Sequence, residues 1–349
     1  MSELIHTKSS TNNLRRHLMA TASALTLIAS ACGTENAFAR DADAPTVWIE
    51  LGGQLERIES SQPSFSPPFI QNAPDTTTPV SPEAAQRAPQ YANGAEGKLS
   101  FEPAGTDLLF SAGIRYGRSN GSKHIHQQTQ LHSSFFGQYP YAFTDVRAKD
   151  DESHMVLDFR AGKDLGLGMF GRHGQSALSL GVRYAQFSSR ANVSISNNPT
   201  SNPYNFHHFY QTGHVDRSFI GIGPSLAWDG SAALLGSEET SLLAFDWGAD
   251  FALLFGRQKS DVRHNTHLIQ PYRGVLYNNT LDRTPSKSIV VPNPGGFAGL
   301  SVRYANAKVT FGYRADFFLS AVDGGLDTRK NAPLNFYGPF ATISVGLGG

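Results

Sequence analysis

The sequence has a single cysteine, no net charge and, after its N-terminal leader, no long apolar run. Cys32 lies within the leader, so a chain that loses this segment has no disulfide, no cysteine nucleophile and no thiolate metal ligand. The 29 lysines and arginines balance the 29 aspartates and glutamates, which gives no electrostatic basis for binding nucleic acid. No later segment has about eighteen consecutive apolar residues, and this excludes membrane-spanning helices.

The leader has the order of a secretory signal peptide. Basic residues between 8 and 17 precede an apolar stretch at 18–31, and "AFA" at 37–39 is a small-residue cleavage site. We expect residues 1–39 to be removed and residues 40–349 to form one exported domain.

The exported part is rich in glycine and aromatic residues and contains short alternating stretches. In 178–184, apolar residues occupy the even positions, and Ser, Gly and Arg occupy the odd positions. The same alternation, with Arg-Tyr at its end, occurs in 108–116 and 300–304. Because successive side chains of a strand point to opposite faces, each stretch predicts a strand with one apolar and one small or charged face. An exported chain of this kind is either a soluble β-sandwich or an outer-membrane barrel.

Ten such segments can be identified, each long enough to cross a membrane as a tilted strand. We expect strands near 46–58, 95–103, 106–119, 152–164, 175–189, 214–228, 240–258, 295–305, 307–321 and 336–349. The pattern predicts an all-β, antiparallel, up-and-down transmembrane β-barrel of about ten strands, within a range of eight to twelve.

The predicted connections alternate between long and short. The long ones are 59–94, 120–151, 190–213, 259–294 and 322–335, and the short ones are 104–105, 165–174, 229–239 and Asn306. Outer-membrane barrels have long outer loops and short periplasmic turns, so five loops and four turns fit ten strands with both termini in the periplasm. A β-sandwich gives no reason for this alternation.

In a barrel, the charged faces line the lumen and the apolar faces contact lipid. The predicted lumen residues are Arg115, Arg183, Arg303, Arg314, Glu50, Glu56, Asp158, Asp246, Asp250 and Asp316. The predicted interface girdle consists of Tyr116, Tyr184, Trp228 and Tyr304, because Tyr and Trp collect where membrane meets water. Two roles stay open for the arginines: pairing with acids to fill the lumen, or acting in permeation.

The C-terminal part carries a family resemblance. "VTFGYRADFFLSAVDGG" (309–325) followed by "FYGPFATISVGLGG" (336–349) resembles the legionella-type major outer membrane protein family, and "LDFRAGKDLGLG" (157–168) fits the same style. The resemblance implies a pore-forming barrel with a porin-like or structural role. The chain departs from many such barrels at its end, where Leu347-Gly348-Gly349 replaces a terminal aromatic residue.

Histidines gather in the expected loops: His124, His126, His132, His207, His208, His214, His264 and His267. Since no carboxylate accompanies them at a convincing spacing, we expect solvated side chains, with a surface metal site at His124 and His126 as the alternative. No nucleophile motif such as GxSxG occurs, so no catalytic residue, metal or cofactor is assigned. A hydrolase acting at the barrel rim would have to combine His207 or His208 with Asp216 or Asp261.

The sequence therefore predicts a non-enzymatic barrel in the outer membrane of a Gram-negative bacterium. We expect porin-like passage of small solutes or a structural role; the alternative is a surface-display or binding barrel with a plugged lumen, and a rim-active hydrolase ranks third. The expected partners are outer-membrane lipid, the barrel-assembly machinery and small solutes.

Overall fold

A computed structural model describes residues 46–60, 91–130, 141–165, 174–199, 208–236, 241–270, 274–325 and 329–347. The predicted signal peptide, 1–39, lies outside these residues. Within the described ranges, no helix is long and apolar enough to cross a membrane.

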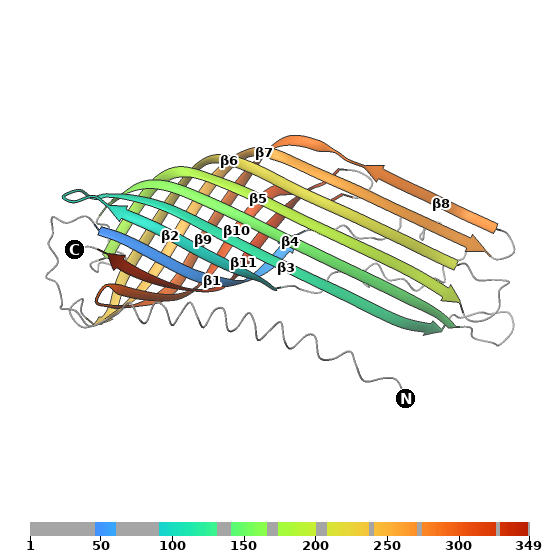
Figure 1. The fold of residues 1–349 in the computed structure, drawn as a ribbon, viewed down its shortest axis with the longest axis horizontal. Coiled ribbons are helices and arrows are strands. Elements are labelled where there is room, and N and C mark those ends of the chain that lie inside the picture. The colour runs from blue at the N-terminus through green and yellow to red at the C-terminus, as the bar shows by residue number, and fades with distance from the viewer. Residues whose placement is uncertain are drawn as a thin grey trace, which may run out of the picture. The chain divides into compact units, whose positions relative to one another are not determined.

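Within the described residues, eleven antiparallel strands make up one sheet (Figure 1). They are β1 (Thr46–Ser60), β2 (Tyr91–Glu102), β3 (Leu108–Gln130), β4 (Tyr141–Asp164), β5 (Gly174–Pro199), β6 (His208–Gly236), β7 (Leu242–Gln270), β8 (Gly274–Arg283), β9 (Ser286–Tyr304), β10 (Ala307–Asp323) and β11 (Asn331–Leu347). Ten of them close into a ring in chain order, because β6 pairs with β7, β7 with β9, and β11 with β1. The prediction of an antiparallel ten-stranded barrel is confirmed.

The side chains divide between the two faces of the ring as the alternation predicts. Large apolar residues point away from the barrel and are exposed, as at Phe159 (60%), Leu180 (66%) and Phe311 (65%). Charged residues point inward and are covered; the side chain of Arg183 is fully buried. A soluble β-sandwich buries its apolar face between two sheets, so this inverted pattern identifies the fold of an outer-membrane β-barrel with a lipid-facing belt.

The four residues predicted for the girdle lie toward the two edges of this belt. Trp228 (44% exposed) and Tyr304 (71% exposed) lie near the turn end, which we define as the end that holds the short connections 103–107 and 305–306. Tyr116 and Tyr184 lie toward the opposite, projecting end, and the Tyr184 hydroxyl donates a hydrogen bond to Gln186.

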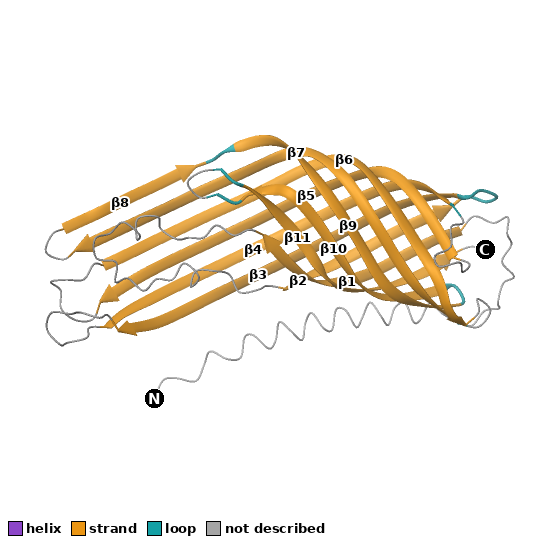
Figure 2. Ribbon diagram, turned by 180° about the vertical axis from the view of Figure 1, so that it is seen from behind, coloured by secondary structure: helices purple, strands orange, loops and turns teal. Residues whose placement is uncertain are grey.

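Beyond the ring, β3 to β7 continue as an open sheet, to which β8 is added at the edge (Figure 2). The pairing of β2 with β3 ends at Arg118, whereas the pairing of β3 with β4 continues to Gln130. We call this part the projecting sheet; it consists of residues 119–130, 141–152, 189–199, 208–217, 260–270 and the whole of β8.

The prediction of three long loops is wrong, because these segments contribute strands to the projecting sheet. Most of 120–151 and 190–213 is strand, and 259–294 contains β8, which pairs with β7 alone. The sequence "SNGSKHIHQQTQ" at 119–130 shows the reason. Here no lipid-facing belt imposes apolar residues at every second position, so the period-two signal is lost although the backbone ladder continues.

The orientation of the barrel can be tested with single cysteines. We expect Asn120→Cys, in the projecting sheet, to react with a membrane-impermeant maleimide on intact cells. Asn306→Cys, in the two-residue turn between β9 and β10, should react only after the outer membrane is permeabilised. The reverse pattern would show that the projecting sheet faces the periplasm, and the chain without an added cysteine gives the background labelling.

Candidate functional site

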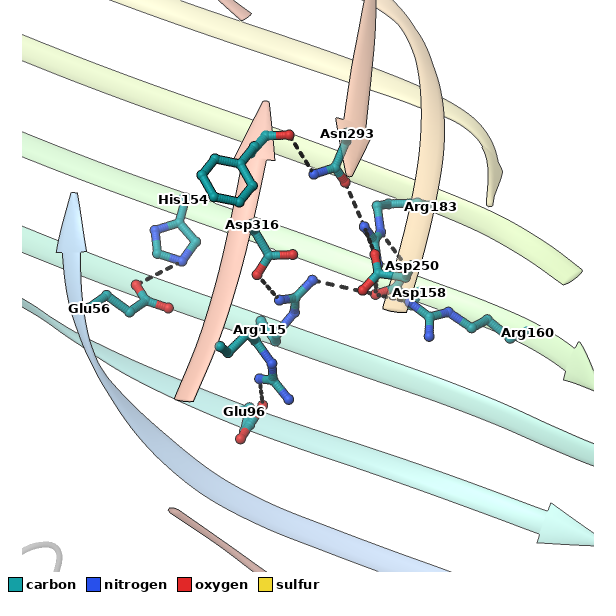
Figure 3. Close-up of polar contacts among 12 residues, drawn as sticks. Glu56, Glu96, Arg115, His154, Asp158, Arg160, Arg183, Asp250, Asn293 and Asp316 are labelled. Carbon is teal, nitrogen blue, oxygen red and sulfur yellow. Dashed lines mark hydrogen bonds and ion pairs between the residues drawn. The ribbon is translucent and has the colours of Figure 1, made fainter. Parts of the chain in front are cut away.

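A layer of ion pairs crosses the barrel interior around Arg183 on β5 (Figure 3). Its Nε lies 2.7 Å from Asp158 Oδ1 on β4, and its Nη1 lies 2.6 Å from Asp250 Oδ1 on β7. Nη1 also donates to Asn293 Oδ1 on β9 at 2.5 Å. The buried guanidinium therefore joins four strands, and each of its nitrogens has an oxygen partner.

Arg115 on β3 extends this layer to the opposite wall. Its Nη1 lies 2.5 Å from Asp316 Oδ2 on β10, and its Nη2 lies 3.8 Å from Asp158 Oδ2. Arg160 also pairs with Asp158, at 3.4 Å. Charges confined in a poorly hydrated interior are tolerated when they are paired and hydrogen-bonded. Every charge of this layer has a partner of opposite sign, although Asp250 Oδ1, Asp316 Oδ1 and Arg160 Nε accept or donate no hydrogen bond within the described residues.

Between this layer and the turn end lies a vestibule of about 320 Å³. Arg314 on its wall pairs with Glu96 and stacks over the ring of Phe340, with 4.7 Å from the guanidinium carbon to the ring centroid. Lys308 Nζ lies 2.5 Å from Asp246 Oδ2. The vestibule is thus polar, and ion pairs connect the charged side chains of its wall.

The structure places all ten predicted lumen residues on the inner face of the barrel. Arg115, Arg183, Asp158, Asp250 and Asp316 form the layer; Arg303, Arg314, Glu50 and Asp246 line the vestibule; Glu56 lies nearer the projecting end. Of the two roles left open for the arginines, pairing describes the contacts of Arg115, Arg183 and Arg314.

A second layer, made of aromatic rings, lies on the projecting side of the ion pairs. Phe187 on β5 contacts Phe318 on β10, with ring centroids 4.5 Å apart, and Phe336 on β11 at 5.6 Å. Phe219 stacks on Phe187 at 5.7 Å. All four rings are buried, with aliphatic side chains such as Leu254 around them. Because β5 lies across the ring from β10 and β11, these contacts span the lumen.

One acid–imidazole pair borders the aromatic layer. Glu56 Oε2 lies 3.1 Å from His154 Nε2, and both side chains are buried. The His154 ring lies 4.1 Å from that of Phe336, centroid to centroid. Glu56 therefore attaches β1 to β4 at the level of the rings.

The aromatic layer was not predicted from the sequence, although a signal for it exists. Phe187 continues the odd, inward series of Arg183, and Phe318 continues the even series of Arg314 and Asp316. A phenylalanine at an inward-facing position, after several charged inward-facing residues, indicates where along the barrel axis apolar side chains fill the lumen. Asn293 and Glu96 were also missed, because the predicted strand at 295–305 began after Asn293 and the acid lies at the start of 95–103.

The projecting sheet carries a groove of about 800 Å³ on the face that continues the lipid-facing side of the barrel. His124 Nε2 lies 2.7 Å from Asp145 Oδ1, and Arg147 Nη2 donates to Asp145 Oδ2 at 3.3 Å. Partial burial alone would raise the pKa of Asp145, but these hydrogen bonds and charges outweigh it and lower the pKa below its usual value.

The two aspartates considered for a rim hydrolase, Asp216 and Asp261, both form ion pairs with arginines. Asp216 pairs with Arg190 at 3.1 Å, and Asp261 pairs with Arg263 at 3.0 Å. The side chains of His126, His132, His207 and His208 lie outside the described part of the structure. Among the side chains that are described, no group of three or more His, Cys, Asp or Glu residues could hold a metal ion.

Comparisons with known proteins give remote structural likenesses. No family model matches the chain, and no curated protein matches it. The outer membrane protease OmpT from Escherichia coli is 13% identical, with 89% of this chain and 99% of that chain covered and a TM-score of 0.39. The transport unit of the autotransporter AIDA-I from Escherichia coli is 9% identical, with 93% and 97% covered and a TM-score of 0.24. These likenesses carry no argument about activity, and the resemblance to the legionella-type family stays a prediction.

Proposed function

We propose that this protein is a closed-lumen barrel of the Gram-negative outer membrane, exported with its leader removed, that presents the projecting sheet as a binding surface. The observation that carries the proposal is the ring contact between Phe187 and Phe318, which joins opposite walls of the lumen. This is the second of the functions expected from the sequence, and it replaces porin-like passage as the preferred one.

Two independent layers support a closed lumen. A permeating ion would have to part the aromatic rings, which offer it no polar contact, and then separate the ion pairs of Arg115 and Arg183. A barrel of ten strands lies near the size at which side chains fill the interior, so closure requires no additional plug domain.

The ion pairs of the two aspartates considered for a rim hydrolase support a non-enzymatic role. Asp216 and Asp261 neutralise neighbouring arginines and so are poorly placed to act as general bases. The partners we propose are outer-membrane lipid on the apolar belt, the barrel-assembly machinery during insertion, and a ligand on the projecting sheet.

The test is electrical. Refolded wild-type protein in planar bilayers should give no single-channel steps, whereas Phe187→Ala/Phe318→Ala combined with Arg115→Ala, which opens the aromatic layer and removes one arginine of the ion-pair layer, should give brief conductance events. The matched control is Phe159→Ala/Phe311→Ala, which removes two rings from the lipid-facing belt and should stay silent. Stable ohmic steps in the wild type would reject the proposal and restore porin-like passage.

A further inference from the structure

The groove on the projecting sheet crosses six strands, from β3 to β8. Neighbouring strands lie about 4.8 Å apart, so six strands span roughly 24 Å, a length that suits an extended chain of several units. Its outward-facing walls include the basic side chains of Arg147, Lys149 and Arg263 and the polar side chains of Ser194, Thr212 and Asn265.

The chemistry of these walls is basic and rich in hydrogen-bonding groups. Arg147, Lys149 and Arg263 line the groove with one carboxylate, Asp282, and the carboxylates of Asp145 and Asp261 lie beside the two arginines. Arg147 and Arg263 are partly neutralised by neighbouring aspartates, but Lys149 has no ion pair with any residue that the structure describes. Between the cations lie hydroxyl and amide groups, which both donate and accept hydrogen bonds.

The position of the groove relative to the membrane narrows the choice of ligand. On β3, Ser122 in the groove lies six positions beyond Tyr116, which is at the edge of the belt. At about 3.4 Å per residue this distance is roughly 20 Å along a tilted strand. Since the polar headgroup region adds only about 5–8 Å to each side of the hydrocarbon, the groove lies beyond lipid headgroups.

We propose that the groove binds an anionic saccharide, bearing phosphate, sulfate or carboxylate groups. This inference rests on the proposed function as a binding barrel and names the ligand class of that surface. Lys149, which has no acidic partner among the described residues, matches an anionic group, and the hydroxyl and amide side chains of Ser194, Thr212 and Asn265 match sugar hydroxyls. An acidic peptide fits less well, because the lining offers few apolar anchors: Val193 is buried and Leu281 is half-buried.

The first experiment is calorimetric titration of the full-length refolded protein with a heparin-derived hexasaccharide. Maltohexaose is the neutral saccharide control, and hexaglutamate is the peptide control. We expect saturable binding of the sulfated saccharide and much weaker binding of both controls. Equal binding of hexaglutamate would overturn the saccharide assignment, and no binding of the hexasaccharide would overturn the site.

Two single variants locate the binding. Lys149→Gln removes the unpaired cation of the groove and should weaken hexasaccharide binding about tenfold, as expected for a lost charge-assisted hydrogen bond. The matched control is Lys259→Gln, on the same face of β7 but outside the groove, and it should bind as the wild type does. Equal weakening by both variants would indicate diffuse charge attraction and reject the groove.

A vesicle experiment distinguishes the source of the saccharide. If the membrane's own sugars occupy the groove, vesicles containing lipopolysaccharide should reduce hexasaccharide binding, and phospholipid vesicles should not. If the ligand is a soluble glycan, both vesicles should leave binding unchanged. These readouts are independent of conductance, so a silent bilayer with no saccharide binding would reject this inference and leave the closed lumen intact.

Discussion

Arg183→Gln should lower the free energy of unfolding by about 3–5 kcal/mol, the loss expected when one member of a buried ion-pair network is removed. The variant leaves Asp158 and Asp250 facing each other around an uncharged amide, without the guanidinium that lies within 2.7 Å of both. The side chain of Arg183 is fully buried, and those of Asp158 and Asp250 are only 14% and 15% exposed, so solvent replaces the lost partner only in part.

Urea unfolding in detergent micelles, followed by tryptophan fluorescence, measures this loss. The matched control is Arg190→Gln on the same strand, because Arg190 pairs with Asp216 at 3.1 Å while its side chain is 59% exposed. An exposed pair contributes about 0–1 kcal/mol, so the control should unfold close to wild type.

A triple variant identifies the cause. Combining Arg183→Gln with Asp158→Asn and Asp250→Asn removes the uncompensated charges, and it should recover part of the lost stability. If the triple variant is no more stable than Arg183→Gln alone, the loss reflects side-chain packing and not unpaired charge.

Much of the barrel was predictable because one physical constraint acts on every spanning strand. A lipid-facing residue must be apolar and its neighbour must face the lumen, so Leu180 and Arg183 fall on opposite faces by parity alone. The same rule placed Arg115, Asp158 and Asp316 inside before any contact was known. Which acid each arginine meets was not predictable, since that depends on the shear and closure of the ring.

The projecting sheet and the aromatic layer escaped prediction for different reasons. In β8 both faces lack the apolar alternation that marks a spanning strand, so composition could not separate it from a loop. Phe187 and Phe318 lie within otherwise charged inward series, and only the closed ring brings these two distant strands together. Local patterns specify which face a side chain occupies, but not what it meets across a lumen.

Leu180→Arg is expected to cost about 2–4 kcal/mol, the penalty for a basic residue near the middle of the lipid-facing belt of a barrel. Leu180 is 66% exposed on the outer face of β5, so it has little protein contact to lose, and the cost comes from placing a charge in hydrocarbon. The control is Ser188→Arg, eight residues farther along the same face, where the strand has left the apolar belt and arginine meets water.

Comparing unfolding in phospholipid vesicles with unfolding in detergent micelles distinguishes the cost of placing a charge in hydrocarbon from a loss of side-chain packing. In vesicles, Leu180→Arg should be the less stable variant, and the difference from Ser188→Arg should shrink in micelles that deform around the charge. Ser179→Arg, at the neighbouring inward-facing position, is not a suitable control. Ser179 is only 5% exposed, and its Oγ lies 2.3 Å from where a side chain would begin at Gly162, so arginine would not fit there. Equal stability of Leu180→Arg and Ser188→Arg in vesicles would mean that this face of β5 does not contact lipid.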